Sequence, residues 1–544
     1  MSDATDPTDA ATTEDFLNIA PETMEELLAT IVSRLEPISA KCLRAVRAHR
    51  ALRCFAQALR SPIPGMADAS FETTEIDEFW SHSWHGRKWN KALTAMYLKN
   101  GMLATAVATF VNVLLAVLVG AEILPPRFQE QPMYPYTSWW CSVTGSLLYC
   151  IVFIFWQPRQ KVFVDVMCIN QENEQEKCQA ILSMGAFLKC SEKLLVLWDT
   201  TYCHRLWCVF ELAGYLHSRG TTRKPNLEIR PTILGPCLVS LPIALSCVVV
   251  LLPFIPWAIF EESGMEFPVA YILWPTFGAC AFVFFYFSVV TLRAYFRSVS
   301  EIETIVHQFS VKDTLCYCCS NDHIAPDGSA MACDRKIVFK CITTWFGSLS
   351  NFETRVREQV ARCLDAQLTR EVFTYRQCAA SAMPVLWHFM DSASTIGHGA
   401  DHYGESRRIF AVVREFVRGI GWSCGVLPTL FFVAVRLAER LQRRRGSRLG
   451  EILINCCILG AVCLIMLGAL VFEIACWNLH LLDMEHSGPY ELFPGTAVFS
   501  LSTVSLAVLL FSCRRCVGLP HQLQKPSEPE NGHELVCRRT ITAL

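Results

Sequence analysis

Short apolar runs alternate with amphipathic stretches between Lys161 and His217. The runs KVFVDV and KLLVLW are almost continuously apolar, which is typical of parallel strands covered by helices on both faces. Between them, Ile181, Met184 and Leu188 recur at helical spacing and form one apolar stripe. The helix predicted for RLWCVFELAGYLHS follows the second run. This order indicates an α/β fold with a parallel sheet.

The same pattern occurs before and after this region. A short strand is predicted from Phe79, followed by a turn at His85–Gly86 and a helix with Trp89, Leu93 and Met96 on one side. NLEIRPTIL, after a basic linker, is a further candidate strand. Polar residues follow the predicted strands, and open α/β sheets bind ligands at these carboxyl ends. We therefore expect any functional site at that edge.

Long apolar runs interrupt the α/β pattern and are long enough to cross a bilayer as helices. Six are predicted to be spans and pair into hairpins: 102–124, 139–156, 237–260, 269–292, 452–472 and 493–513. A seventh run, Gly419–Val435, is short and contains Pro428. We interpret it as re-entrant, interfacial or buried, because an even number of spans returns the chain to its starting side.

These patterns divide the chain into the following regions. They are a disordered terminus (1–15), an N-terminal helical region (16–78), the first part of the α/β domain (79–100), a transmembrane hairpin (101–160), the second part of that domain (161–234), another hairpin (235–292), a mostly helical soluble block (293–418), the re-entrant segment (419–435), a last hairpin (452–513) and a flexible tail (514–544).

Composition supports a multi-pass membrane protein with soluble parts. Of 544 residues, 52% are hydrophobic and 18% charged, and the mean hydropathy is +0.30. The net charge of −2 gives no basis for nucleic-acid binding. The 27 cysteines are scattered through all regions, so we expect mostly reduced thiols. The acidic N-terminus has no apolar core, and no signal peptide is predicted.

The distribution of basic residues predicts the orientation. Lys and Arg crowd the soluble regions and the loop Arg436–Arg448, whereas the three hairpin connections carry Arg127 alone. By the positive-inside rule, both termini, the α/β domain and the second soluble block are predicted to be cytoplasmic.

Three short sequences carry a resemblance to a known family: SHSW at 81–84, FVDVMCINQ at 163–171, and the run from Tyr202 through Arg205 and Trp207 to Glu211. Together they resemble the TIR domain superfamily, and DVMCINQ is even closer to the related fungal heterokaryon-incompatibility (HET) domains. The resemblance covers about Phe79–Asn100 and Lys161–Leu234. It implies a flavodoxin-like α/β module that assembles with like modules in signalling.

Some TIR domains cleave nicotinamide from NAD with a glutamate in a W-C-x-x-E helix, and Glu211 occupies that position. A fixed carboxylate stabilises the cationic ribose that forms when an N-glycosidic bond breaks. Cys208 lies on the same helix face, and Ser81, Ser83 and Asn170 are candidates to line the same NAD-binding cleft. The alternative is structural: Glu211 pairs with Arg205 or Arg219, and the serines bond local backbone groups.

Two functional classes follow. The first is a membrane-anchored signalling scaffold that docks on copies of itself or on other TIR-like domains. The second is an NAD-cleaving enzyme that uses Glu211. We favour the scaffold, because a domain interrupted by a hairpin retains its exposed loops more readily than a closed cleft. A transporter or channel is a remote alternative, since the predicted span centres contain no Asp, Glu, Lys or Arg.

A cysteine-rich segment is the second candidate site. Cys316, Cys319, His323 and Cys333 give the spacing C-x2-C-x3-H-x9-C, close to that of a zinc knuckle, with Cys318 as a substitute ligand. Adjacent cysteines in a cysteine-rich chain are also an ordinary coincidence. His398 and His402 form a weaker pair, for which a solvated loop is the simpler interpretation.

The predicted orientation can be tested with epitope tags. Tags at Pro132, Gly264 and Gly488 should be accessible from the side opposite to tags at either terminus, because they lie in hairpin connections with few basic residues. Protease protection or antibody labelling of intact vesicles measures this. An Arg443 loop that is accessible together with the hairpin connections would contradict the scheme.

Overall fold

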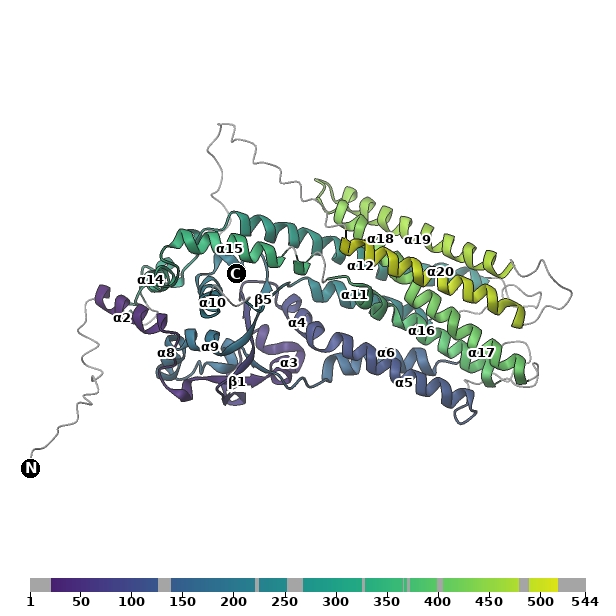
Figure 1. The fold of residues 1–544 in the computed structure, drawn as a ribbon, viewed down its shortest axis with the longest axis horizontal. Helices are drawn as coiled ribbons and strands as arrows, with labels where there is room; N and C mark the ends of the chain where they lie inside the picture. The colour runs from purple at the N-terminus through teal and green to yellow at the C-terminus, as the bar shows by residue number, and fades with distance from the viewer. Residues whose placement is uncertain are drawn as a thin grey trace, which may run out of the picture.

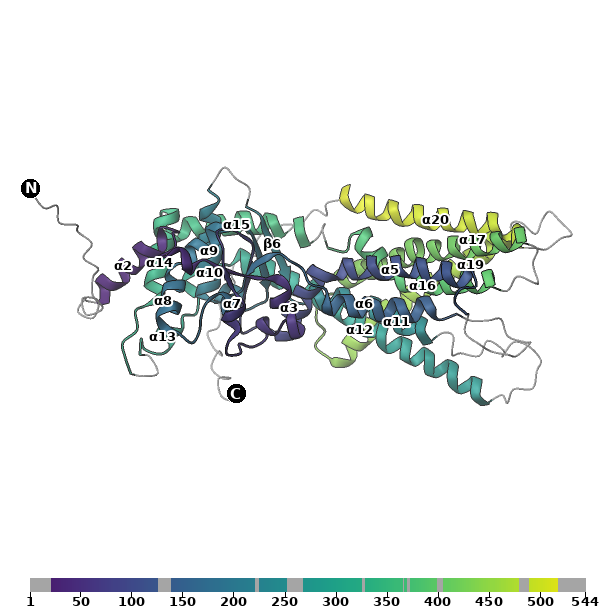
Figure 2. The same ribbon diagram turned by 90° about the horizontal axis from the view of Figure 1, so that it is seen from below.

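The computed structural model describes residues 21–125, 138–220, 225–251, 268–324, 328–364, 366–368, 372–398, 405–478 and 489–516. A domain built around a β-sheet forms one end of the molecule, and a bundle of long helices forms the other (Figure 1). The view from below shows the same division (Figure 2).

The described residues contain one six-stranded sheet in the order β2-β1-β4-β3-β5-β6. Its strands are β1 (Arg44–Arg47), β2 (Phe71–Glu72), β3 (Ile76–His82), β4 (Lys161–Phe163), β5 (Ser191–Trp198) and β6 (Leu227–Pro231). The four adjacent strands β4, β3, β5 and β6 are parallel, as the apolar runs predicted. β1 is antiparallel to both β2 and β4, so the sheet as a whole is mixed.

Most helices of this domain lie where the periodicity predicted them. They are α2 (Pro21–Ser33), α3 (Ala48–Ala56), α4 (Lys88–Met96), α7 (Asp165–Cys168), α8 (Glu174–Leu182), α9 (Met184–Cys190) and α10 (Leu206–Ser218). The helix expected over 176–191 is broken at Ser183, whose hydroxyl donates to Gln179 O (2.8 Å) and accepts from Ile38 N (3.1 Å).

The region 16–78, expected to be helical, also contributes two strands. Its helical pattern corresponds to α2, but Ala45 and Val46 are fully buried in β1, where Val46 pairs with Val162 of β4. Pairing across the sheet edge decides this conformation, because four residues carry too little pattern to distinguish a strand from a helix.

The parallel strands run away from the helical bundle. Lys91, near the start of α4, donates to Ser83 O just after β3 (2.7 Å), whereas Lys99, beyond its end, donates to Glu78 at the start of β3 (2.5 Å). α4 is therefore antiparallel to β3. The amino ends of the strands face the bundle, and the carboxyl ends face away from it.

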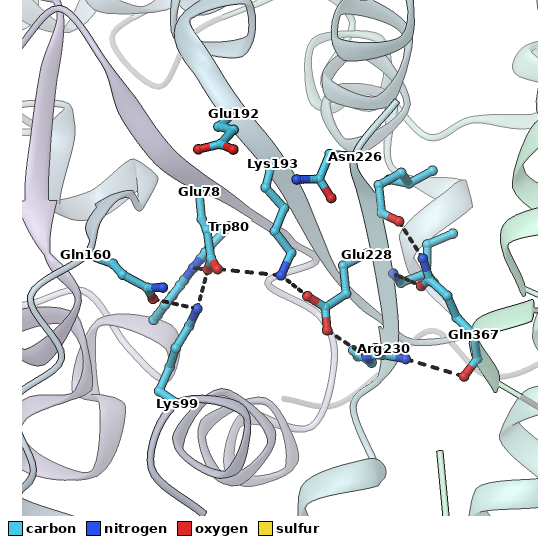
Figure 3. A network of polar contacts seen from close by, with 12 residues as sticks. Glu78, Trp80, Lys99, Gln160, Glu192, Lys193, Asn226, Glu228, Arg230 and Gln367 are labelled. Carbon is cyan, nitrogen blue, oxygen red and sulfur yellow. Dashed lines mark hydrogen bonds and ion pairs between the residues drawn. The ribbon is translucent and has the colours of Figure 1, made fainter. Parts of the chain in front are cut away.

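A network of ion pairs and hydrogen bonds occupies this junction between sheet and bundle. It connects Glu78, Lys99, Gln160, Lys193, Glu228, Arg230 and Gln367 (Figure 3). Glu78 is 4% exposed and contacts both Lys99 and Lys193. Each charge in the network contacts an opposite charge, so none of these charges is left unpaired at the sheet's amino edge.

The bundle consists of α5 (Met102–Gly120), α6 (Trp140–Phe155), α11 (Leu234–Leu251), α12 (Pro268–His307), α16 (Tyr375–His398), α17 (Glu405–Ile420), the π-helix η11 (Gly421–Val426), α18 (Leu427–Arg440), α19 (Arg448–Asn478) and α20 (Pro489–Cys516). In the described part of the chain, six helices are long and apolar enough to span a membrane, which supports an integral membrane protein. α6 is apolar but shorter.

The segment 419–435 lies inside one of these six helices, which extends from Arg408 to Arg440. Its partner is α16, from the region assigned by sequence to a soluble block. The two are antiparallel, since Tyr375 Oη donates to Cys424 O (2.8 Å) while Gly419 packs against Phe389. α16 was missed because its polar residues interrupt the apolar pattern. This hairpin returns the chain to the end of the bundle where the sheet lies (Figure 1).

The rest of the second soluble block packs on the sheet domain. It contains α13 (Tyr317–Ser320), α14 (Asp334–Phe346) and α15 (Leu349–Leu364). Trp345 of α14 donates from Nε1 to Ser33 O (2.9 Å), and its ring packs on Phe210 of α10. The domain and the block therefore share one hydrophobic core.

Asp391 of α16 offers a test of the bundle. Its carboxylate accepts from the backbone N–H groups of Cys141 and Ser142 (2.8 Å each) and from Ser138 Oγ (3.0 Å), and thereby caps the start of α6. Asp391→Asn leaves a single acceptor oxygen and should reduce the free energy of unfolding by about 1–3 kcal/mol.

Thermal unfolding of the detergent-purified protein measures this effect. Ser392→Ala is a suitable control, because the Ser392 hydroxyl bonds within its own helix. Equal stability of Asp391→Asn and the control would contradict the capping role.

Candidate functional site

A cluster of polar side chains lies at the carboxyl edge of the parallel strands. Ser81 of β3 is at its centre: its hydroxyl donates to Glu211 Oε2 and lies 2.7 Å from the hydroxyl of Tyr202. Cys208 joins the cluster through Sγ, 3.6 Å from His82 O. The structure thus brings together Ser81, Cys208 and Glu211, as the sequence predicted.

The local sequence explains this convergence. Cys208, Glu211 and Tyr215 recur at three- and four-residue spacing and face the sheet. Tyr215 confirms the direction of this face, since its hydroxyl donates to Glu192 O at the start of β5 (2.9 Å). Tyr202 is fully buried in the turn after β5, where its hydroxyl contacts Ser81 and donates to Cys208 O (3.3 Å).

The environment of Glu211 favours its neutral form. Burial raises the pKa of its carboxyl to about 8, against the hydrogen bond from Ser81, which lowers it. Neither Arg205 nor Arg219 forms an ion pair with Glu211 within the described residues: Arg205 contacts His85 (2.7 Å) and Arg219 bonds to Ser191 O. At neutral pH the carboxyl is therefore mostly protonated.

A second polar layer lies beside the first. Ser83 Oγ is 2.7 Å from Thr201 Oγ1, and Thr201 donates to Asp199 Oδ1 through both its backbone N–H (2.7 Å) and its hydroxyl (2.5 Å). Gly86 lies directly against this layer. A Cβ atom at this position would be only 1.8 Å from Asp199 Oδ2. The glycine allows the loop after β3 to approach Asp199.

Two buried bases complete this layer. Burial lowers the pKa of Lys91 to about 8 and that of His82 to about 4. Lys91 is fully buried and donates to Ser83 O. The sequence analysis did not select Lys91, although the helical spacing could have indicated it. Lys91 shares one face of α4 and its continuation with Ala95 and Leu98, and a charged residue is unusual on such a face.

Asn170 lies apart from these groups. Its amide nitrogen donates to Glu176 Oε2 (3.0 Å) and its oxygen accepts from Glu172 N (3.0 Å), within the turn that precedes α8. These bonds order the turn and give Asn170 a structural role.

A cavity of about 400 Å³ opens next to the cluster. Its lining comprises His85, Thr201, His204, Arg205, Leu206, Trp207, Leu315, Cys316, Tyr317 and Ser320. As far as the structure describes the chain, neither Glu211 nor Ser81 belongs to this lining. The cavity therefore presents imidazole, guanidinium and aromatic groups rather than the candidate carboxyl.

The cysteine-rich segment forms a compact group on the far side of the cavity. The ligand atoms of Cys318, Cys319, His323 and Cys333 all lie within 4.8 Å of one another. The sequence spacing favoured Cys316 over Cys318 as a ligand. The Cys316 sulfur lies 3.0 Å from the Cys318 sulfur. The structure thus gathers three of the four predicted ligands with the substitute Cys318, and keeps Cys316 next to them.

No family model matches this chain, and neither the curated proteins nor the solved structures contain a significant match to it.

The raised pKa of Glu211 predicts a pH-dependent stability. Between pH 4.5 and about 8 the folded protein retains a proton that the unfolded chain releases, so stability should fall as pH rises. The lowered pKa of His82 makes stability depend on pH between about pH 4 and 6.5, and the lowered pKa of Lys91 does so above about pH 8. The interval from pH 6.5 to 8 therefore reports on Glu211 among these three.

Thermal unfolding of wild type and Glu211→Gln across this interval is the measurement. The Tm of the wild type should fall by about 1–2 °C relative to that of the variant as pH rises. Glu192→Gln, at an exposed position of the same domain, should behave as wild type. Parallel pH profiles for wild type and Glu211→Gln would show that the carboxyl is already ionised.

Proposed function

We propose that this chain is a membrane-anchored signalling scaffold whose TIR-like domain docks on copies of itself or on like domains. One observation carries this choice: the Glu211 carboxyl is held by Ser81 and stands outside the lining of the neighbouring cavity. Its raised pKa also favours the neutral form, and a neutral carboxyl outside the cavity is poorly suited to stabilise a cationic ribose.

The strand order supports the TIR-like assignment. Numbered along the chain, the four parallel strands β3, β4, β5 and β6 stand in the order 2-1-3-4, which is how a flavodoxin-like sheet begins. The antiparallel strands β1 and β2 extend the sheet beyond β4. A sheet with this order presents its loops at the carboxyl edge, where docking contacts would form.

The connection between domain and bundle supports a signalling role. One helix continues from Lys88 in the sheet domain to Gly120 in the bundle, and α12 is a single helix of 40 residues that leads from the bundle to the cysteine-rich segment. Continuous helices transmit rotation and translation more directly than flexible linkers. A change in the bundle would therefore reach the sheet domain.

The proposed docking surface surrounds the cavity at the end of the domain remote from the bundle. Leu315 and Tyr317 are each 65% exposed there, beside Arg205 and His85. Exposed apolar side chains next to basic groups are common in contact surfaces. From the distribution of basic residues along the chain, we infer that this surface faces the cytoplasm.

The alternative function is NAD cleavage by Glu211. It is favoured by the meeting of Glu211, Ser81 and Cys208 at the carboxyl edge of parallel strands, where α/β folds bind nucleotides. An enzyme of this kind would have to move Glu211 towards the substrate and ionise it.

Self-association of the full chain in lipid nanodiscs or mild detergent tests the scaffold. Tyr317→Ser should weaken the association at least ~10-fold, because a central aromatic contact is worth about 2 kcal/mol. Ile63→Ser, another exposed apolar residue of the same domain, is the matched control and should have no effect. A Tyr317→Ser protein that associates like wild type would contradict the proposed surface.

Nicotinamide release from NAD decides between the two functions. The assay should use protein in the associated state, with wild type compared with Glu211→Ala. We expect no release. Release by wild type that disappears in Glu211→Ala would establish the enzyme, since a catalytic carboxylate contributes about 3 kcal/mol or more to lowering the barrier.

A further inference from the structure

We propose that Cys318, Cys319, His323 and Cys333 bind one zinc ion, and that this ion holds the wall of the cavity at the carboxyl edge in place. The inference does not depend on the proposed scaffold function, because it rests on the geometry of the donor atoms and on the contacts that surround them.

Two separations between donor atoms match a tetrahedral zinc site. With Zn–S near 2.3 Å and Zn–N near 2.0 Å, a tetrahedron places two sulfurs about 3.8 Å apart and a sulfur and a nitrogen about 3.5 Å apart. The Cys319 and Cys333 sulfurs are 3.7 Å apart, and the Cys319 sulfur is 3.6 Å from His323 Nε2. Three thiolates and one imidazole are a common structural zinc set.

The backbone brings these groups together through a tight turn. Asp322 and His323 both adopt left-handed conformations, with φ of 50° and 60°. His323 N donates to Cys318 O (2.8 Å), which returns the imidazole to Cys319. Met331 N then donates to His323 O (2.8 Å) and aligns the extended segment that leads to Cys333. Strained turns of this kind persist where other interactions hold them, and a bound ion would do so here.

Polar contacts around the cluster suit a thiolate centre. Asp334 N donates to the Cys318 sulfur (3.3 Å), as backbone groups do to zinc-bound thiolates. Cys333 N donates to Glu25 Oε1 (3.0 Å), so α2 fixes the backbone of one ligand. Cys316, beside Cys318, remains as a neighbouring thiol within the same layer.

The cluster is connected to the cavity on two sides. Leu315 N donates to His204 O (2.7 Å) and Leu206 N donates to Leu315 O (3.3 Å), so the segment entering the cluster pairs with the loop before α10. On the other side, Trp207 Nε1 donates to Asp334 Oδ2, next to the ligand Cys333 (3.3 Å). Leu315, Tyr317 and Trp207 all line the cavity. Loss of the ion would therefore loosen this wall.

Elemental analysis of the full-length protein, purified in detergent without metal-affinity resin, tests the site. Wild type should contain one zinc per chain, and the zinc content of Cys319→Ser should be at least ~10-fold lower. His323→Cys, which retains a soft ligand, should keep zinc, as should Cys178→Ser at an exposed cysteine elsewhere in the domain. A folded wild type without zinc, or with iron in its place, would overturn the proposal.

A measurement on wild type alone covers the case in which Cys319→Ser fails to fold. Alkylation followed by mass spectrometry should find Cys318, Cys319 and Cys333 protected until a chelator is added, and hydrogen exchange in 311–324 and 203–207 should then increase while that in β5 stays slow. Protection and exchange that do not respond to the chelator would refute the zinc site.

Discussion

The pairing of β3 with β4 is the contact on which the rest of the molecule depends. Phe79 and Phe163 stack at 4.4 Å between these neighbouring strands, yet the chain between them passes through α5 and α6. The sheet can therefore form only if this apolar excursion returns to its starting end. Asn112 Nδ2, which donates to Cys141 O (2.9 Å), and Asn100 Nδ2, which donates to Phe153 O (2.9 Å), hold the two helices side by side. The hairpin of α11 and α12 meets the same requirement, because the cysteine-rich segment and α14, which follow it, must also reach the sheet domain.

The junction between sheet and bundle must also accommodate buried charged groups. Strands that begin next to apolar helices need polar groups satisfied without bulk water, since an unpaired buried charge is strongly unfavourable. The chain places alternating charges on β3, β5 and β6, and Lys99 from the helix below joins them (Figure 3). Gly235 allows the close approach of α11 to α4, because a Cβ there would lie 2.3 Å from Thr94 N. The domain is thus attached to the bundle by ion pairs and by close helix packing rather than by a flexible linker.

At the opposite edge of the sheet, two chemically different features share one region. The carboxyl of Glu211 is half-buried and favours its neutral form, while the cavity next to it is lined by Arg205 and His85. The cysteine-rich segment supplies the outer wall of that cavity. Under the proposed scaffold function, the accessible basic and aromatic groups of this edge would recognise a partner. The long helices that lead from the sheet domain into the bundle would connect such recognition to the membrane.

The sequence by itself determined the alternation of apolar strands and amphipathic helices from Lys161 to His217, the long apolar helices and the face of α10 that carries Cys208 and Glu211, because each depends on local periodicity. It also indicated candidate thiol and imidazole ligands through their spacing. Only the tertiary structure decided the rest. β1 is a strand because β4 offers it an edge, and α16 belongs to the bundle because Asp391 finds the open end of α6. Likewise, Lys91 is buried because Ser83 O accepts a hydrogen bond from it, and a left-handed turn places His323 beside Cys318 and Cys319 of the short helix. Contacts between residues far apart in the chain set these outcomes, and local pattern carries no information about them.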